Sequence, residues 1–587
     1  MATLFDTPTR QDATPPSRPL GGGWRQLING RYLAMAIASI VVAYLALVPV
    51  STMVYASLQS NFLGVGSSSW TFSNYAKTFT TAGFGTLVAN SFIYAAATSA
   101  VCIVVGFGLA WLVVRTNAPF KGFARAAALV PLIIPGVLNT IAWSLLLSPQ
   151  QGPLNHVLQS VGLPAFNIYS LQGMVFVQSM HVVPVAYLMG TAAFSSMDMS
   201  MEEASLASGA SPVRTFFSIT LRMARPAILS AALLMFIQTI SNFEVPQLIG
   251  VPGHTYVFVS QIYAALQQFP ADYGTVGVIG VFVLVIAVAG LYISRRVSKG
   301  AGIQTITGKA FRAQVQDLGK WRWLGFACFV VFFVVAVALP LAMLLWSSLL
   351  PGYESPSLHA LRDFTLSNYS SIFSQPALVQ SLKNSLIVSV STGLIVTVLS
   401  AVVAYVTVKT KIIGRGLLDG LATVPIAVPS VVMGVGILYF YLIAPLPVHL
   451  YGTLAIMVIA FVTITMPYAM RYIVPGLAAI KDELEEAATS SGASWFQGFW
   501  RIFVPLLMPS LLAAFLYSMI VSFREISAAI FLYSTGTQVV SVQIYDLFRN
   551  GDYPVVAALG IMMIIFLVIL VVLVQLVSRA VGIKQRR

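Results

Sequence analysis

Long apolar stretches alternate with short polar segments along the whole chain. Each stretch has about 20 residues or more, the length that an α-helix needs to cross a bilayer, so we expect about twelve membrane-spanning helices. The first stretch follows a polar lead and has no small-residue cleavage site, so we interpret it as a span and not as a signal peptide. The predicted spans lie near residues 33–57, 87–114, 125–147, 171–195, 227–250, 273–294, 322–349, 384–408, 416–443, 451–474, 510–533 and 554–579.

Composition agrees with a surface that faces lipid. Of the 587 residues, 58% are hydrophobic and 9% are charged, whereas about 25% of an ordinary soluble domain is charged. The mean hydropathy is +0.86. These values exclude a soluble enzyme. The two cysteines, Cys102 and Cys328, lie in separate apolar runs, so we expect neither a disulfide framework nor a thiolate metal site.

The basic residues fall in alternate loops. They precede the first span and lie between the second and third and the fourth and fifth spans, whereas loops 148–170 and 251–272 contain no Lys or Arg. By the positive-inside rule the basic loops are cytoplasmic. This places the tails 1–30 and 581–587 and the connector 295–321 on the cytoplasmic side of the membrane. Topology thus accounts for the net charge of +14, and no nucleic-acid partner is expected.

The chain is an internal duplication. FSNYAKTF begins at residue 72 and LSNYSSIF begins 294 residues later, and the same spacing relates Pro131 and Pro135 to Pro425 and Pro429. Near the ends of the two halves, SQIYAAL at 260–266 matches VQIYDLF at 542–548. We therefore predict an all-α protein built from two parallel six-helix repeats, residues 31–294 and 322–580. Such repeats associate about a pseudo-twofold axis along the membrane normal, with a pathway between them.

The cytoplasmic loops between the fourth and fifth spans carry the most informative motif. They read MEEASLASGASPVRTFFSITLRMARPAIL at 201–229 and LEEAATSSGASWFQGFWRIFVPLLMPSLL at 484–512, and they align without a gap. Each predicts a short amphipathic helix with carboxylates on its N-terminal side, where the helix dipole favours them. A glycine that allows the backbone to turn follows, and then a second helix.

These loops resemble those of the membrane subunits of binding-protein-dependent ABC importers. That family has Glu-Ala-Ala, three residues, Gly, nine residues, Ile, one residue and Leu-Pro. The second copy departs from it at Val504, and the first departs at Ser205 and Arg222. In that family the loop forms a coupling helix that docks on a cytoplasmic ATPase. For loops 198–226 and 480–509, the resemblance implies ATPase-coupling roles for Glu203, Ala204, Gly209, Ile219, Glu486, Ala487, Gly492 and Ile502.

Patterns for nucleotide or metal binding are missing from the sequence. The phosphate-binding pattern G-x-x-x-x-G-K-[ST] does not occur, so we expect ATP and Mg to be used by a separate ATPase. The five histidines are dispersed, and no cluster has the spacing of metal ligands. We therefore expect a transporter without a catalytic residue, a metal site or a bound cofactor.

Ionisable residues interrupt the fifth predicted span of each half. Glu244 lies in the first half, and Arg524 and Glu525 lie in the second. Such residues are costly in a bilayer and usually face a pathway or a partner. Adjacent residues on a helix do not face one another, so Arg524 and Glu525 each need another partner. We hypothesise that Arg524 pairs with Glu244 across the pseudo-twofold, at the pathway. The alternative is that these charges are solvated at the outer interface.

The fifth and sixth spans add a second resemblance. FEVPQLIG, VFVSQIYAAL and FREISAAIFLY are similar to segments of the fused double permeases of the ferric-iron uptake type. The resemblance implies one chain that forms the whole pathway, two identical cytoplasmic ATPases and a periplasmic or lipid-anchored solute-binding protein. Ferric iron is the first expected solute and 2-aminoethylphosphonate the next. The alternatives are an ion-gradient-driven secondary transporter, which would not need the duplicated loops, and a membrane scaffold without transport activity.

Overall fold

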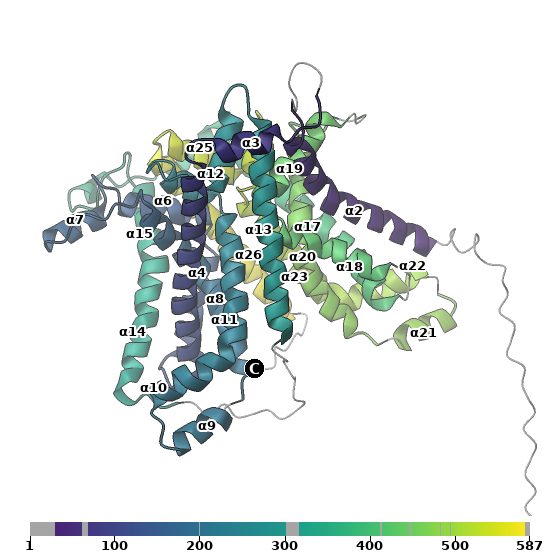
Figure 1. Cartoon of the computed structure of the whole chain (residues 1–587), viewed down its shortest axis with the longest axis horizontal. Helices are drawn as coiled ribbons and strands as arrows, with labels where there is room; N and C mark the ends of the chain where they lie inside the picture. The colour runs from purple at the N-terminus through teal and green to yellow at the C-terminus, as the bar shows by residue number, and fades with distance from the viewer. Residues whose placement is uncertain are drawn as a thin grey trace, which may run out of the picture.

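The protein is helical throughout the part of the chain that the computed structural model describes (Figure 1). That part comprises residues 30–60, 68–198, 200–300, 316–410, 414–444, 447, 449–481, 483–493 and 495–580. Within it, extended pairing is limited to two isolated bridges. The all-α prediction is therefore confirmed. The predicted tails 1–30 and 581–587 and most of the connector 295–321 lie outside the described residues.

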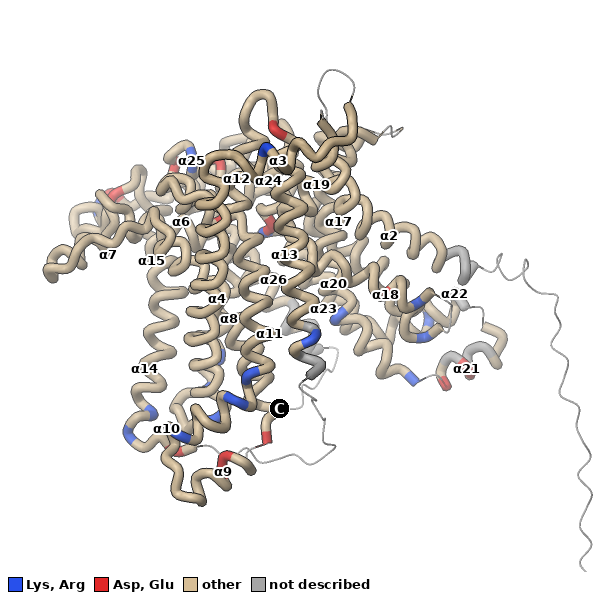
Figure 2. The backbone as a smooth tube through the Cα atoms, viewed as in Figure 1, with Lys and Arg blue, Asp and Glu red and all other residues tan. Residues whose placement is uncertain are grey.

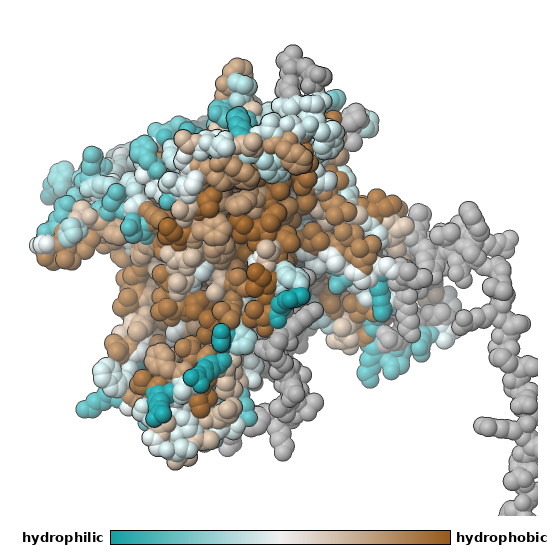
Figure 3. All heavy atoms as spheres, in the orientation of Figure 1, coloured by the Kyte–Doolittle hydropathy of each residue, from teal (hydrophilic) through white to brown (hydrophobic). Residues whose placement is uncertain are grey.

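In the described residues, ten helices are long and apolar enough to cross a membrane. A broad apolar belt covers the visible face of the molecule between two more polar ends (Figure 3), and charged residues gather mostly at those ends (Figure 2). The spanning helices are α2 (Gly30–Ser57), α4 (Phe84–Arg115), α8 (Leu171–Ser196), α11 (Leu221–Ile240), α13 (Tyr273–Gly300), α14 and α15 (Arg322–Phe333 and Leu339–Ser348, joined by a π-helical turn), α17 (Pro376–Lys409), α20 (Leu454–Ala478), α23 (Val504–Arg524) and α26 (Tyr553–Ala580).

The third span of each half, predicted at 125–147 and 416–443, is broken. A helix pair bends by 96° in the first half and by 108° in the second. Each break lies at the second proline of a pair, Pro135 or Pro429. Proline removes a backbone donor and keeps the preceding residue out of the α region, which ends the first helix there. The four helices are α5 (Lys121–Leu129), α6 (Gly136–Leu146), α18 (Arg415–Thr423) and α19 (Ser430–Ile443).

The fifth helices end earlier than the predicted spans 227–250 and 510–533. α11 ends at Ile240 and α23 at Arg524, so Glu244 and Glu525 lie just beyond them. The Asn242 side chain accepts from the Val245 N–H (3.0 Å) and Glu525 accepts from the Ala528 N–H (3.1 Å). Such local side-chain bonds to the backbone compete with the helical ladder and favour a turn.

The first helix of each half packs on the other half. α2 contacts α19 as well as α13 of its own half, and Thr52 Oγ1 donates to the Gly436 carbonyl at 2.7 Å. In the reverse direction, α14 and α15 pack on α5 and α6, and the Tyr353 hydroxyl donates to the Leu145 carbonyl at 2.9 Å. The two halves therefore interlock. The first helix of each half, exchanged in this way, covers the broken third span of the other half.

Candidate functional site

The first loop between the fourth and fifth spans folds as the sequence predicts. α9 (Ser200–Ala207) is followed by Gly209, whose φ of +83° lies in the left-handed region that favours glycine. The Ser211 side chain then caps α10 (Pro212–Thr215), and a π-helical turn, Phe216–Thr220, leads directly into α11.

The second loop repeats this design. α21 (Glu483–Ser490) precedes Gly492, whose φ is +79°. α22 (Trp495–Gly498) and a π-helical turn, Phe499–Phe503, then lead into α23. The π-helical turn occurs in both loops although Arg222 stands in the first where the family motif has proline. Both loops lie away from the end of the molecule that carries α3, α12 and α25 (Figure 1).

Both loops expose apolar side chains together with the predicted coupling residues. Val213 is 67% exposed, Phe217 61% and Trp500 49%. Exposed apolar groups rimmed by polar residues mark surfaces that bind another protein. Of the predicted coupling residues, Ile219 and Ile502 are half-buried, and the exposed ones are Glu203, Ala204, Gly209, Glu486, Ala487 and Gly492.

The carboxylate that anchors the first loop is Glu202, which sequence reasoning did not single out. Its Oε1 accepts from the Thr220 hydroxyl at 2.8 Å, and its Oε2 lies 3.8 Å from Nη1 of Arg115. Nη2 of Arg115 donates to the Met197 carbonyl at 3.0 Å. The matching contact in the second half joins Lys409 to the Ile480 carbonyl. A basic residue at the end of the second span therefore holds the start of the loop in each half.

We expect Glu202→Ala to loosen α9. The substitution removes one hydrogen bond and leaves the guanidinium of Arg115, only 4% exposed, with Asp198 as its remaining acidic neighbour. Loss of a bond to a charged group costs about 1.5–3 kcal/mol of local stability. Hydrogen exchange over residues 200–207 should therefore be at least about tenfold faster. Glu203→Ala is the matched control because Glu203 is exposed; equal exchange in both variants would contradict the anchor.

Charged side chains meet at the break in the third span of the first half. Nη1 of Arg524 donates to the Leu132 carbonyl at 2.6 Å, and the Glu244 carboxylate lies against Gly136 at the start of α6. The hypothesised direct ion pair between Arg524 and Glu244 is thus not what the described residues show. Arg524 binds a carbonyl before Pro135 and Glu244 lies beside the helix start after it, where a broken helix leaves carbonyl and N–H groups without intrahelical partners.

Four buried aromatic rings join the two halves next to these charges. The ring of Tyr263 lies 6.2 Å from that of Tyr545, and these residues hold equivalent positions in the repeated Gln-Ile-Tyr segments of α12 (Phe258–Gln267) and α25 (Val540–Arg549). Phe243 lies 6.0 Å from Phe531 and 5.8 Å from Tyr545. Equivalent residues touch only near a twofold axis, so this aromatic quartet marks the pseudo-twofold. The repeated segment was its only signal in the sequence.

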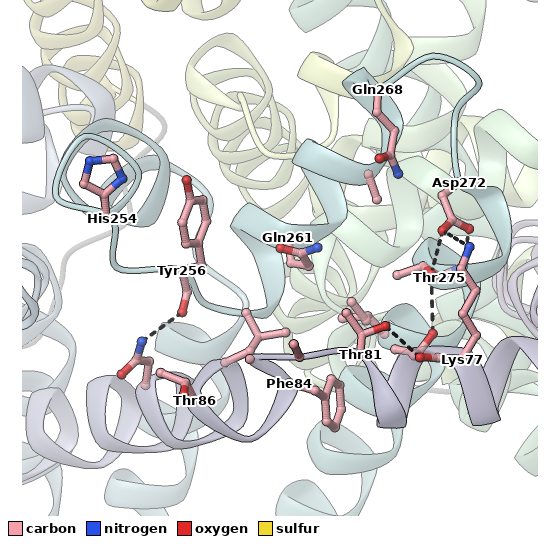
Figure 4. A pocket seen from close by; sticks show the side chains of 17 residues that line it. Lys77, Thr81, Phe84, Thr86, His254, Tyr256, Gln261, Gln268, Asp272 and Thr275 are labelled. Atoms are coloured by element: carbon pink, nitrogen blue, oxygen red, sulfur yellow. Dashed lines mark hydrogen bonds and ion pairs between the residues drawn. The ribbon is translucent and has the colours of Figure 1, made fainter.

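A cavity of about 570 Å³ opens beside α3 (Ser73–Thr80) and α12, with its lining residues all in the first half (Figure 4). Lys77 and Asp272 form an ion pair of 2.8 Å at one side of it. Burial alone would raise the pKa of the Asp272 carboxyl, but hydrogen bonds from Lys77 and Thr275 outweigh burial and hold that pKa below its usual range. Because all of its lining residues belong to the first half, the cavity is separate from the surface that the two halves share. The described residues contain no group of three His, Cys, Asp or Glu side chains that could hold a metal ion.

Two repeats, broken third spans and duplicated exposed loops define a membrane permease. The chain belongs to the family of binding-protein-dependent transport system inner membrane components, which it matches over residues 102–301 and 393–583. It is therefore a permease component of an ABC transporter, a multi-pass inner-membrane protein and not itself an enzyme. The prediction of two related permease repeats in one chain is confirmed.

The chain is also similar to individual transport proteins. A ferric transport system permease protein of Actinobacillus pleuropneumoniae is 26% identical over 78% of this chain and 66% of its own length, just under two thirds. A putative 2-aminoethylphosphonate transport system permease protein of Salmonella paratyphi A is 29% identical over 43% of this chain and 94% of its own. A chain of a bacterial alginate ABC transporter, solved with a periplasmic protein bound to an alginate pentasaccharide, aligns over 47% of this chain and 99% of its own, with 18% identity and a TM-score of 0.38.

Proposed function

We propose that this permease forms the pathway of an ATP-driven importer for ferric iron. Two identical cytoplasmic ATPases dock on the two loops, where they bind and hydrolyse ATP with Mg, and this chain binds no cofactor. A periplasmic or lipid-anchored binding protein delivers the solute to the opposite face. The tails 1–30 and 581–587 are cytoplasmic, on the same side as the loops.

The pair of exposed loops is the observation that carries this proposal. Their helices, left-handed glycines and π-helical turns recur in the same order, which gives two like surfaces for two like partners. Glu203, Ala204, Gly209 and Ile219 supply the first coupling surface, and their counterparts in the second half are Glu486, Ala487, Gly492 and Ile502. Similarity to ferric permeases supports iron as the solute, and similarity to a phosphonate permease supports 2-aminoethylphosphonate as the second candidate.

Purification of the tagged chain in mild detergent tests the assembly. We expect an ATPase with a phosphate-binding loop to co-purify, and we expect the complex in proteoliposomes to take up ⁵⁵Fe³⁺ only with ATP and its binding protein. Saturable uptake of labelled 2-aminoethylphosphonate in place of iron would transfer the assignment to the phosphonate. Uptake driven by an ion gradient without ATP or an ATPase would contradict the importer and identify the protein as a secondary transporter.

A further inference from the structure

The break in the third span of the first half is held from both sides by charged residues. α6 begins at Gly136, and each of its eleven residues is buried. Its first backbone N–H groups therefore have no access to water, and Pro135 offers no side-chain cap. The Glu244 carboxylate lies against this N-terminus, beside Gly136, with its negative charge at the positive end of the helix dipole.

The space for this carboxylate depends on Gly136. A Cβ atom at position 136 would lie 1.9 Å from Oε2 of Glu244 and 2.8 Å from its Cδ. Heavy atoms that are not bonded cannot approach this closely, so any side chain at position 136 would displace Glu244. Glycine here is required by the close approach and not by its backbone angles.

The other side of the break is held from the second half. Arg524 reaches across the pseudo-twofold to the Leu132 carbonyl, which ends the short 3₁₀ turn after α5. Glu525 repels the Glu244 carboxylate and Arg524 attracts it. Glu525 itself accepts from the Ala528 N–H in its own loop. In the described residues of the second half, no charged side chain is found on the matching break before α19.

These contacts adjoin the aromatic quartet. Phe243, a member of the quartet, directly precedes Glu244, and its ring packs on Tyr263, Phe531 and Tyr545. The four rings are at most 8% exposed, so the two halves are closed against each other at this level. The two charged contacts therefore belong to a state in which the pathway is shut beside the quartet.

We propose that Glu244 and Arg524 are positioning residues that hold the broken third span of the first half, Glu244 from the same half and Arg524 from the fifth span of the second half, and that this clasp stabilises the closed state. This proposal rests on the importer function proposed above. Opening on the side of the quartet separates the halves, so it breaks the bond from Arg524 to Leu132. A weakened clasp shifts the equilibrium towards the open state, which the binding protein and ATP otherwise bring about.

Gly136→Ala and Glu244→Ala both test the contact between Glu244 and the start of α6, the first by displacing the carboxylate and the second by removing it. In the complex with its ATPase in nanodiscs, we expect each variant to raise ATP hydrolysis without binding protein about tenfold, the change that a lost bond to a charged group gives. The double variant should match the single variants, because both remove one contact. Gly108→Ala is the matched control, since nothing lies within 4 Å of a Cβ at that position of α4.

The outcomes separate the clasp from the importer function. Unchanged or lower hydrolysis in folded variants, or additive effects in the double variant, would overturn the clasp. If Gly136→Ala fails to fold, ATP hydrolysis is compared between Arg524→Met and Arg524→Lys. The clasp predicts a rise only in the methionine variant, because only the lysine retains a charged donor. A wild-type complex in which binding protein does not stimulate hydrolysis would instead contradict the proposed function.

Discussion

Charge reversal on both loops, Glu203→Arg with Glu486→Arg, is expected to release the ATPase and abolish ATP-driven uptake. Both carboxylates are exposed on short helices that also carry exposed apolar side chains, Met201 and Leu484. A reversed charge at a docking surface replaces attraction by repulsion and costs several kcal/mol. Two reversals therefore weaken each docked ATPase by at least about a hundredfold.

The measurement is the amount of ATPase that co-purifies with the permease, followed by uptake in vesicles. Glu354→Arg with Asp363→Arg is the matched control, because these carboxylates are also exposed but lie in the loop between the seventh and eighth spans, at the other end. Full recovery of the ATPase with the doubly reversed loops would exclude Glu203 and Glu486 from the coupling surface.

Gly436→Val is expected to separate α2 from the second half. A Cβ at position 436 would lie 2.1 Å from the Pro49 carbonyl oxygen, a backbone atom that cannot rotate away. The hydrogen bond from Thr52 to the Gly436 carbonyl would be lost as well. Overpacking of this kind costs about 3 kcal/mol, so thermal unfolding in detergent should begin at a lower temperature than in the wild type.

A matched substitution, Gly420→Val, controls for a β-branched residue in a helix. Nothing lies within 4 Å of a Cβ at that position of α18, so only the small helix-propensity term remains. Limited proteolysis should then cut near α2 in the first variant alone. The same unfolding temperature in both variants would show that α2 adapts to the larger residue without cost.

Much of the architecture could be predicted from the sequence because lipid demands long apolar helices. Tyr273 and Ser57, for example, lie at helix ends where the apolar pattern placed them. The repeated glycines of the two loops also predicted their turns, since Gly209 and Gly492 have positive φ. These features depend on local patterns, and local patterns are what a single sequence contains.

The remainder depended on contacts between distant segments. Pro135 and Pro429 are visible in the sequence, yet a proline inside an apolar run is compatible with a gentle kink as well as a sharp break. Glu202 and Glu203 are neighbours of the same type, and only the position of Arg115 decides which one is the anchor. We expected Arg524 to pair with the carboxylate of Glu244 because their charges are opposite. In the structure its guanidinium instead binds the Leu132 carbonyl at the break in the third span.

The exchanged first helices make neither half complete alone. If the connector were cut, the first half would lack the cover that α14 and α15 give to α5 and α6, and the second would lack α2 over α19. Each fragment would expose to lipid a bent segment with unsatisfied backbone groups, which a bilayer core does not tolerate. Two fragments made together in one cell should instead assemble, because the exchange needs both partners but not an intact polypeptide between them.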